Sequence, residues 1–317
     1  MQKFRIRTFF KNFLFLFNSH RPSNKPNVLI FSLPRSGSTW LQELIWTQPY
    51  FKYANEPLNL KGSFLRKISS INGFEELYKY ETRHKVLDYF LRITEGRIHV
   101  FDPSPLRKYY RFSTSRIVFK VIHGGEIFFK DIAEHTNSKA IFLLRNPIAV
   151  ALSRKQLPRI KELTSPKVLS IFSEEEKLVI SETLKSGNDR ELKILMWCIQ
   201  NKLVLHYLPE DAIIIAYEQL ITEPEQTLKK IAFHCDLPDL DKMIKSVSIP
   251  SAVSTQSESE SVNLMQDNIE MRLKLIANWR NKVTDEEAKT YFGICEKLNF
   301  GIYSNESDLP NLAILQH

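Results

Sequence analysis

The sequence predicts an α/β fold in which helices cover both faces of a central parallel sheet, giving three layers. Four short apolar runs rich in β-branched residues are typical of strands buried on both faces, at residues 28–32, 116–121, 140–144 and 212–217. Helical patterns are expected at about 38–47, 73–93, 126–135, 148–157, 174–208, 224–235, 263–278 and 285–298. Because strands alternate with helices, the connections are crossovers and the strands run parallel.

The first 27 residues are expected to lie outside the main domain. Up to residue 17, Lys and Arg alternate with apolar residues that are mostly Phe. This basic amphipathic pattern leaves two alternatives, a segment lying on an anionic membrane surface and a helix packed on its own domain. Residues 18–27 have the composition of a linker. We therefore expect an N-terminal segment and linker at 1–27, the main domain at 28–303 and a tail at 304–317.

The composition is that of a globular protein with excess positive charge. The 317 residues are 43% hydrophobic and 25% charged, with a net charge of +8, which suits anionic ligands. The basic residues are scattered and carry no nucleic-acid-binding signature, which argues against a nucleic-acid partner. Three cysteines, far apart in the sequence, form neither a metal-ligand spacing nor a disulfide framework. They are typical of buried thiols in the cytoplasm, and no apolar run is long enough for a transmembrane helix.

The loop after the first strand has the chemistry of a phosphate site. Residues 28–41 read VLIFSLPRSGSTWL: a buried strand, a turn, and then a helix. This order directs free backbone N–H groups and the positive end of the helix dipole at one point, which binds phosphate or sulfate. The candidate binding residues are Arg35, Ser36, Gly37, Ser38 and Thr39.

This loop is close to a Walker A motif, G-x-x-x-x-G-K-[ST], but lacks its lysine. Ser38 stands at that position, and the cation is Arg35 instead. In kinases and ATPases the lysine neutralises the terminal phosphates, so its absence argues against an ATP-dependent enzyme. A P-loop-like ATP-dependent kinase is still the alternative enzyme, although the missing lysine counts against it. A catalytically inactive nucleotide-binding module is the alternative outside catalysis.

A second candidate phosphate site follows the third strand. Arg145 ends that strand, and Ser153 lies about two turns along the next helix. Such a pair can hold one phosphate, Arg by a two-pronged hydrogen bond and Ser by a single one. The carboxyl ends of parallel strands meet at one edge of the sheet, so Arg35, His123, Arg145 and Tyr217 are expected to gather there.

The two loops together resemble the sulfotransferases that use 3′-phosphoadenosine 5′-phosphosulfate (PAPS). The resemblance spans about residues 28–303 and implies a P-loop NTPase-like three-layer fold, sulfuryl transfer to a hydroxyl, PAPS as the cofactor and no metal. It implies that Arg145 and Ser153 hold the 3′-phosphate. Trp40 and Tyr217 would border the adenine, although Trp40 also fits a core position. The Arg-Lys-Gly triplet of cytosolic members is absent after residue 250.

Arg35 in the loop and the segment Asn55-Glu56-Pro57-Leu58 resemble the carbohydrate and tyrosylprotein type of this family. That type implies a carbohydrate or glycolipid acceptor and a Glu base shortly after the first phosphate helix, which makes Glu56 the favoured catalytic base. Arg35 would stabilise the transferring group. His123 is the alternative base, because cytosolic members place a catalytic His at this interval before the 3′-phosphate Arg. With Glu56 as the base, His123 would be a helper or a substrate ligand.

Overall fold

A computed structural model describes residues 13–60, 64–98, 107–122, 124–155, 159–249 and 269–315. Its centre is a five-stranded parallel sheet with the strand order β3-β5-β2-β6-β7. The strands are β2 (Asn27–Ser32), β3 (Phe51–Asn55), β5 (Arg116–Val121), β6 (Ser138–Leu144) and β7 (Ile213–Ala216). A separate two-stranded sheet pairs β1 (Ser19–His20) with β4 (Ser113–Thr114). The predicted α/β fold with a central parallel sheet is confirmed.

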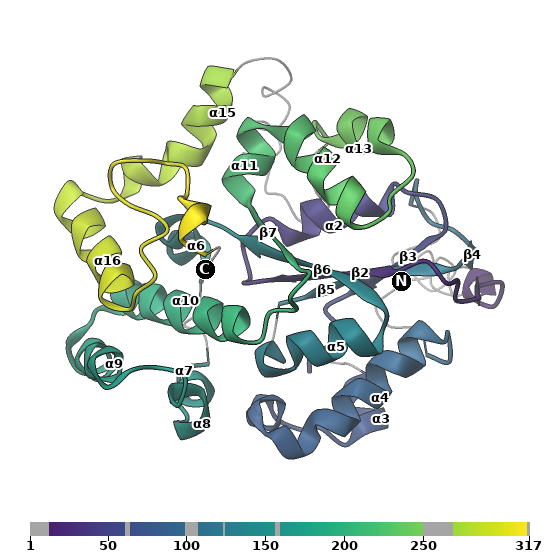
Figure 1. Cartoon of the computed structure of the whole chain (residues 1–317), viewed down its shortest axis with the longest axis horizontal. Coiled ribbons are helices and arrows are strands. Elements are labelled where there is room, and N and C mark those ends of the chain that lie inside the picture. Colours follow the sequence, from purple (N-terminus) through teal and green to yellow (C-terminus); the bar gives the residue numbers. More distant parts are fainter. Residues whose placement is uncertain are drawn as a thin grey trace, which may run out of the picture.

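Helices cover both faces of the sheet (Figure 1). One face packs against α2 (Ser38–Trp46), α11 (Tyr217–Thr222), α12 (Pro224–His234) and α13 (Leu240–Ser246). The other packs against α4 (Arg83–Thr94), α5 (Phe129–His135), α6 (Pro147–Ser153), α10 (Asp189–His206) and α16 (Asp285–Lys297). These two helical layers and the sheet between them make the three layers.

Shorter elements surround this core. The remaining α-helices are α3 (Phe64–Ser69), α7 (Ile160–Leu163), α8 (Pro166–Leu169), α9 (Glu174–Ser186) and α15 (Ile269–Ile276). The 3-10 helices are η1 (Phe74–Tyr78), η2 (Tyr80–Thr82), η3 (Glu126–Phe128), η4 (Ala277–Lys282) and η5 (Leu312–Leu315). Within the described ranges, no helix is both long and apolar enough to cross a membrane.

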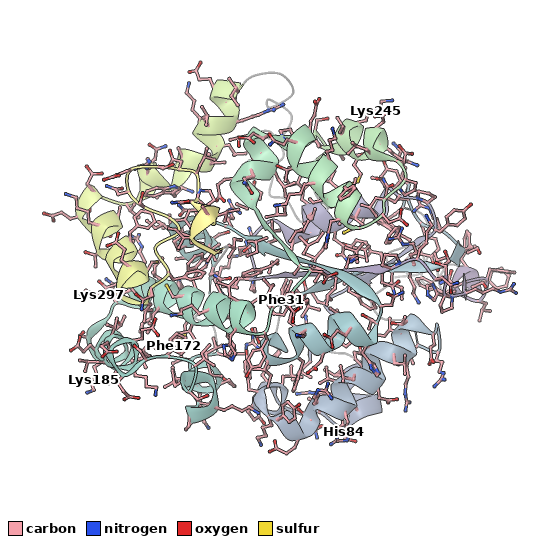
Figure 2. The ribbon with its side chains drawn as sticks, viewed as in Figure 1. Phe31, His84, Phe172, Lys185, Lys245 and Lys297 are labelled. Carbon is pink, nitrogen blue, oxygen red and sulfur yellow. The ribbon has the colours of Figure 1, made fainter. Side chains whose placement is uncertain are left out.

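The central strand β2 is buried along its whole length, which explains its unbroken apolar sequence. Successive side chains point to opposite faces, so Val28 and Ile30 join one core cluster while Leu29 and Phe31 join the other. Phe31 lies near the middle of the molecule in Figure 2. Burying one such side chain contributes roughly 1.5–3 kcal/mol. This core holds the carboxyl end of β2, where the candidate phosphate loop begins, in a fixed position.

Several expected elements differ in detail from the structure. Residues 51–55, for which the sequence analysis predicts neither a strand nor a helix, form the edge strand β3, which pairs with β5. The helical pattern at 73–93 divides into η1, η2 and α4, and the one at 148–157 ends at Ser153. The three cysteines are buried free thiols, but Cys198 and Cys295 lie in contact, with their Sγ atoms 3.5 Å apart.

Candidate active site

The candidate phosphate loop connects β2 to α2 and has an unusual backbone. Gly37 has a φ of +84° and stands at the N-cap of α2, and Arg35 has a φ of +74°. A Cβ atom at Gly37 would lie 2.4 Å from Cδ2 of Tyr217, so only glycine fits there. Gly37 offers no side chain to cap the helix, which leaves the N–H groups of the first turn directed at the space beyond the loop.

The two predicted phosphate segments meet in the structure. Nε of Arg35 donates a 2.8 Å hydrogen bond to Oγ of Ser153. Nη1 of Arg145 donates a 2.8 Å hydrogen bond to the backbone carbonyl oxygen of Arg35. Nε of Arg145 is buried without a hydrogen-bond partner among the described residues. The arrangement therefore offers an orphaned cationic donor beside the N-terminus of α2, which fits an anionic ligand.

Aromatic rings border the same place. The guanidinium carbon of Arg145 lies 4.2 Å from the ring centroid of Tyr217. The edge of Trp40 meets the Tyr217 ring at a centroid distance of 6.1 Å. Trp40 is only 7% exposed and belongs to the core cluster of α2, so most of its surface is already occupied by protein. Tyr217 begins α11 directly after β7 and is the more accessible of the two rings.

A lysine that the sequence analysis did not select as a site residue, Lys120, connects Glu56 to the first turn of α2. Nζ of Lys120 donates to Oγ1 of Thr39 at 2.9 Å and to Oε1 of Glu56 at 3.0 Å. The Lys120 side chain is 3% exposed, and burial lowers its pKa, although Glu56 opposes this effect. The sequence signal was a charged residue within the apolar strand RIVFKV. Such a lysine needs a buried partner, and Glu56 supplies it.

The backbone around Glu56 is also specialised. Glu56 has a φ of +50°, and its N–H donates to the carbonyl oxygen of Lys120 at 2.9 Å, which extends the β3–β5 pairing by one residue. Its second carboxylate oxygen accepts a 3.1 Å hydrogen bond from Nδ2 of Asn59. Two side chains thus orient the carboxylate at the edge of the sheet where the phosphate loop lies.

A buried carboxylate supports the second phosphate segment from behind. Oε1 of Glu218 accepts from the backbone N–H of Asn146 at 2.9 Å, and Oε2 accepts from the Tyr303 hydroxyl at 2.8 Å. Burial raises the pKa of Glu218. The Asn146 side chain caps α6 by accepting from the N–H groups of Ile148 and Ala149. These contacts fix the chain directly after Arg145.

The structure brings most of the predicted site residues to one edge of the sheet. Ser36 and Ser38 lie within the loop and are buried. His123 lies outside the described residues, so its prediction stays untested. In the part of the chain that the structure describes, no group of three or more His, Cys, Asp or Glu residues is placed to hold a metal ion.

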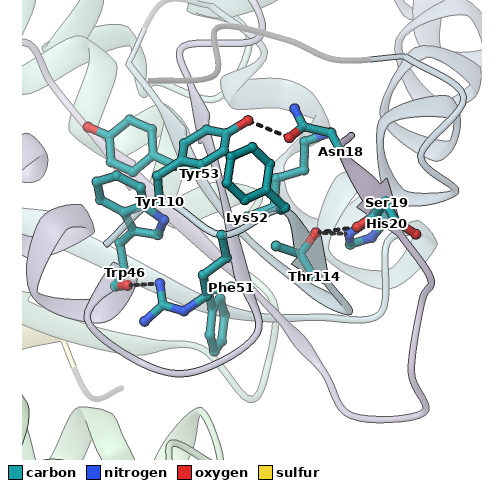
Figure 3. Close-up of a pocket in the computed structure, with 11 residues that line it drawn as sticks. Asn18, Ser19, His20, Trp46, Phe51, Lys52, Tyr53, Tyr110 and Thr114 are labelled. Atoms are coloured by element: carbon teal, nitrogen blue, oxygen red, sulfur yellow. Dashed lines mark hydrogen bonds between the residues drawn. The ribbon is translucent and has the colours of Figure 1, made fainter. Parts of the chain in front are cut away.

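A separate pocket lies away from this edge, by the two-stranded sheet (Figure 3). It is partly open to solvent and is lined by residues that include Trp46, Phe51 and Tyr53. Hydrogen bonds from Tyr110 to Asn18 and between His20 and Thr114 cross its walls. Because it adjoins the start of β3 rather than the end of β2, it is not the phosphate site.

Comparison with known proteins identifies the family of the chain. The family model of the sulfotransferase domain matches residues 25–301. Over 266 residues the chain is 23% identical to cytosolic sulfotransferase 14 of Arabidopsis thaliana, covering 84% of this chain and 69% of that protein. It also resembles the crystal structure of mouse sulfotransferase SULT7A1 complexed with PAP, with 15% identity, a TM-score of 0.44, and coverage of 90% of this chain and 88% of that one. A sulfotransferase domain from the curacin biosynthetic pathway shows 16% identity, a TM-score of 0.43, and coverage of 88% and 99%. Since the family model covers most of its length, the chain belongs to the sulfotransferase family.

Proposed function

We propose that this sulfotransferase moves a sulfuryl group from PAPS to a hydroxyl of a carbohydrate or glycolipid acceptor by in-line displacement. The observation that carries the proposal is the meeting of Arg35, Arg145 and Ser153 at the N-terminus of α2. Cationic side chains and free N–H groups at one point suit a ligand with several anionic groups. We further propose that residues 28–303 form the catalytic domain.

The residues at the carboxyl edge of the sheet would bind three different parts of PAPS. Arg35 and the backbone N–H groups of Ser36, Gly37, Ser38 and Thr39 would hold the 5′-phosphosulfate. Arg145 and Ser153 would hold the 3′-phosphate, and Tyr217 with Trp40 would border the adenine. When bound, PAPS supplies the sulfuryl group and a phosphate leaving group. Arg35 would also stabilise negative charge on the oxygens of the transferring group.

Glu56 would take the proton from the acceptor hydroxyl at its carboxylate. Lys120 supports this role because it links Glu56 to Thr39, a residue of the proposed donor site, so a bound donor would lie close to the carboxylate. A base within reach of both reactants lowers the barrier by holding them in a reactive geometry. His123 would then assist or bind the acceptor, and it remains the alternative base.

The carbohydrate or glycolipid acceptor rests on the Arg35 loop and the Asn55-Glu56-Pro57-Leu58 segment, both of the type found in carbohydrate sulfotransferases. We place the enzyme in the cytoplasm, in keeping with its three thiols and with a cytosolic relative. A membrane contact through residues 1–17 is supported by Phe13, Leu16 and Phe17, which are 47%, 78% and 60% exposed. Co-sedimentation with anionic vesicles tests it, with the Phe13→Ser/Phe17→Ser variant expected to stay in solution.

The decisive experiment is calorimetric titration with adenosine 3′,5′-bisphosphate and, separately, with ATP, without magnesium. Tight binding of the bisphosphate with weak binding of ATP is the expected result. Preference for ATP once magnesium is added would favour a kinase instead. Bisphosphate binding without transfer to any acceptor in a glycan and glycolipid panel would indicate an inactive nucleotide-binding module.

A further inference from the structure

Two arginines outside the proposed donor site, Arg154 and Arg159, are partly buried. Arg154 directly follows Ser153 at the end of α6, and Arg159 precedes α7 (Figure 1). Nη1 of each guanidinium is enclosed and has no hydrogen-bond partner among the described residues. Burial and the like charge of Arg159 lower the pKa of Arg154 to about 10. Because an unpaired charge that is largely shielded from water is strongly destabilising, Arg154 indicates a missing anionic partner.

Glu126 forms a long ion pair with Arg159 and none with Arg154. Oε1 of Glu126 lies 3.8 Å from Nη2 of Arg159, beyond hydrogen-bond distance, and it accepts a 3.1 Å hydrogen bond from Nε2 of Gln200. Across the described ranges, the Arg154 side chain makes no ion pair or hydrogen bond. Arg154 therefore lacks a counter-charge from the described protein.

Aromatic side chains flank Arg159. Its guanidinium carbon lies 4.6 Å from the ring centroid of Phe74 and 5.7 Å from that of Tyr78. A Cβ atom at Gly124 would lie 3.0 Å from Nη1 of Arg159, so the guanidinium lies against the chain that leaves β5. A few precisely placed charges among aromatic side chains are typical of a small-molecule subsite.

The same subsite adjoins the proposed base. A Cβ atom at Gly125 would lie 2.4 Å from Cδ1 of Leu58, a residue of the Glu56 segment. Arg154 follows Ser153, whose hydroxyl contacts Arg35. Arg154 is thus next in sequence to a residue of the proposed donor site, and Arg159 contacts the turn that packs on the Glu56 segment. An acceptor must approach from this side, because its hydroxyl has to meet both the base and the donor.

We propose that Arg154 and Arg159 bind an anionic group, a carboxylate, sulfate or phosphate, carried by the acceptor. The inference rests on the proposed function and narrows its acceptor to an anionic molecule. The donor already has Arg35, Arg145 and Ser153 for its phosphates, so Arg159, on the Glu56 side, is left for the acceptor. A guanidinium pair recognises such groups by two-pronged hydrogen bonds.

The test is calorimetric titration of the full chain, saturated with adenosine 3′,5′-bisphosphate, with inorganic sulfate at constant ionic strength. We expect sulfate to bind the wild type and to bind Arg154→Gln and Arg159→Gln at least about tenfold more weakly. Arg190→Gln, which loses a surface hydrogen bond to Glu287, is the matched control and should keep the wild-type affinity. Arg154→Lys keeps the charge and should show intermediate affinity, which guards against a folding defect in the glutamine variants. Equal sulfate affinity in the wild type and both glutamine variants would overturn the proposal.

Two further measurements separate the sources of the anion. Affinity for the bisphosphate should be the same in Arg154→Gln and the wild type; a tenfold loss would assign Arg154 to the donor and overturn its assignment to the acceptor. Methyl glucuronide should compete with sulfate, whereas methyl glucoside should not, and equal competition by the two would contradict an anionic acceptor. If the wild type binds no bisphosphate, the proposed function fails, but the same sulfate titration without nucleotide still decides the anion subsite.

Discussion

Arg145 donates a 2.8 Å hydrogen bond from Nη1 to the backbone carbonyl oxygen of Arg35, so one phosphate segment holds the other in shape. Arg35 has a φ of +74°, a conformation that costs a non-glycine residue about 1–3 kcal/mol. This hydrogen bond, together with the cation–π contact between Arg145 and the Tyr217 ring, helps to keep the loop in this conformation. Arg145 therefore has a positioning role in addition to its proposed contact with a phosphate.

Arg145→Lys should weaken binding of adenosine 3′,5′-bisphosphate by about tenfold or more, although the charge is kept. Lysine cannot contact the Arg35 carbonyl, lie flat on Tyr217 and hold a phosphate at the same time. Arg35→Ala and Arg145→Ala should also weaken binding, as measured by calorimetry. Arg280→Lys, which changes a guanidinium bound to Asp308 near the C-terminus, is the control and should bind normally. Unchanged affinity in both alanine variants would exclude the proposed donor site.

Gly37→Ala should abolish tight bisphosphate binding and lower the free energy of unfolding by about 1–3 kcal/mol. The new methyl group meets the Tyr217 ring at 2.4 Å, and the φ of +84° disfavours alanine. Gly293→Ala is the matched control. No atom lies within 4 Å of a Cβ at Gly293 in α16, so alanine should stabilise that helix by about 0.5–1 kcal/mol. The Gly37→Ala/Tyr217→Ala double variant should regain part of the lost stability but not the binding.

The layered fold could be predicted because its strands are strongly patterned. β2 and β5 are buried on both faces, so residues 28–31 and 117–119 are apolar runs, and the helices between them are long enough to show a period. β3 was missed as a strand because it lies at the sheet edge and contains Lys52 and Asn55, which interrupt an apolar pattern. The breaks among η1, η2 and α4 were missed because 3-10 turns share nearly the same spacing of apolar residues.

The parts of the candidate site whose backbone conformation follows from a local motif could be predicted from the sequence. The side-chain contacts between residues far apart in the sequence could not. The loop around Gly37 follows from local sequence. By contrast, the link from Lys120 to Thr39 joins residues 81 apart, and the Arg35–Ser153 contact spans 118 positions. The interval between Arg145 and Ser153 predicts a binding pair, but spacing alone could not show that Ser153 accepts a hydrogen bond from Arg35. Side-chain partners across a sheet depend on register, which only the assembled strands define.

Glu56→Gln should bind bisphosphate with wild-type affinity yet lose sulfuryl transfer by about 10²–10⁴-fold, because an amide cannot accept the acceptor proton at neutral pH. Binding should survive, since Lys120 stands between Glu56 and Thr39 of the proposed donor site and donates to both. Glu225→Gln, an exposed carboxylate on α12, is the control and should transfer normally. Loss of turnover in His123→Asn with full activity in Glu56→Gln would transfer the role of base to His123.

Glu218→Gln should change how the free energy of unfolding depends on pH. Burial raises the pKa of Glu218 above its ordinary value of 4.5. At a pH between the ordinary pKa and the raised pKa, the folded chain holds a proton on Glu218 that the unfolded chain has released. The free energy of unfolding of the wild type therefore falls as pH rises through that range. Glutamine has no such titration. Urea unfolding at pH 4 and pH 8 should therefore show the wild type losing stability relative to Glu218→Gln as pH rises.

Tyr303→Phe should change the pH dependence of stability in the opposite direction from Glu218→Gln. This difference separates the titration of Glu218 from a general effect of mutation. The Tyr303 hydroxyl donates to Oε2 of Glu218 and stabilises its charged form. Tyr303→Phe removes that donor, so the pKa of Glu218 should rise further and the loss of stability with pH should be larger than in the wild type. Parallel stability curves for the wild type, Glu218→Gln and Tyr303→Phe would show that Glu218 does not titrate as a buried acid. In that case Glu218 would be charged in the folded chain at both pH values, and another group would have to compensate its buried negative charge beside Asn146 and Tyr303.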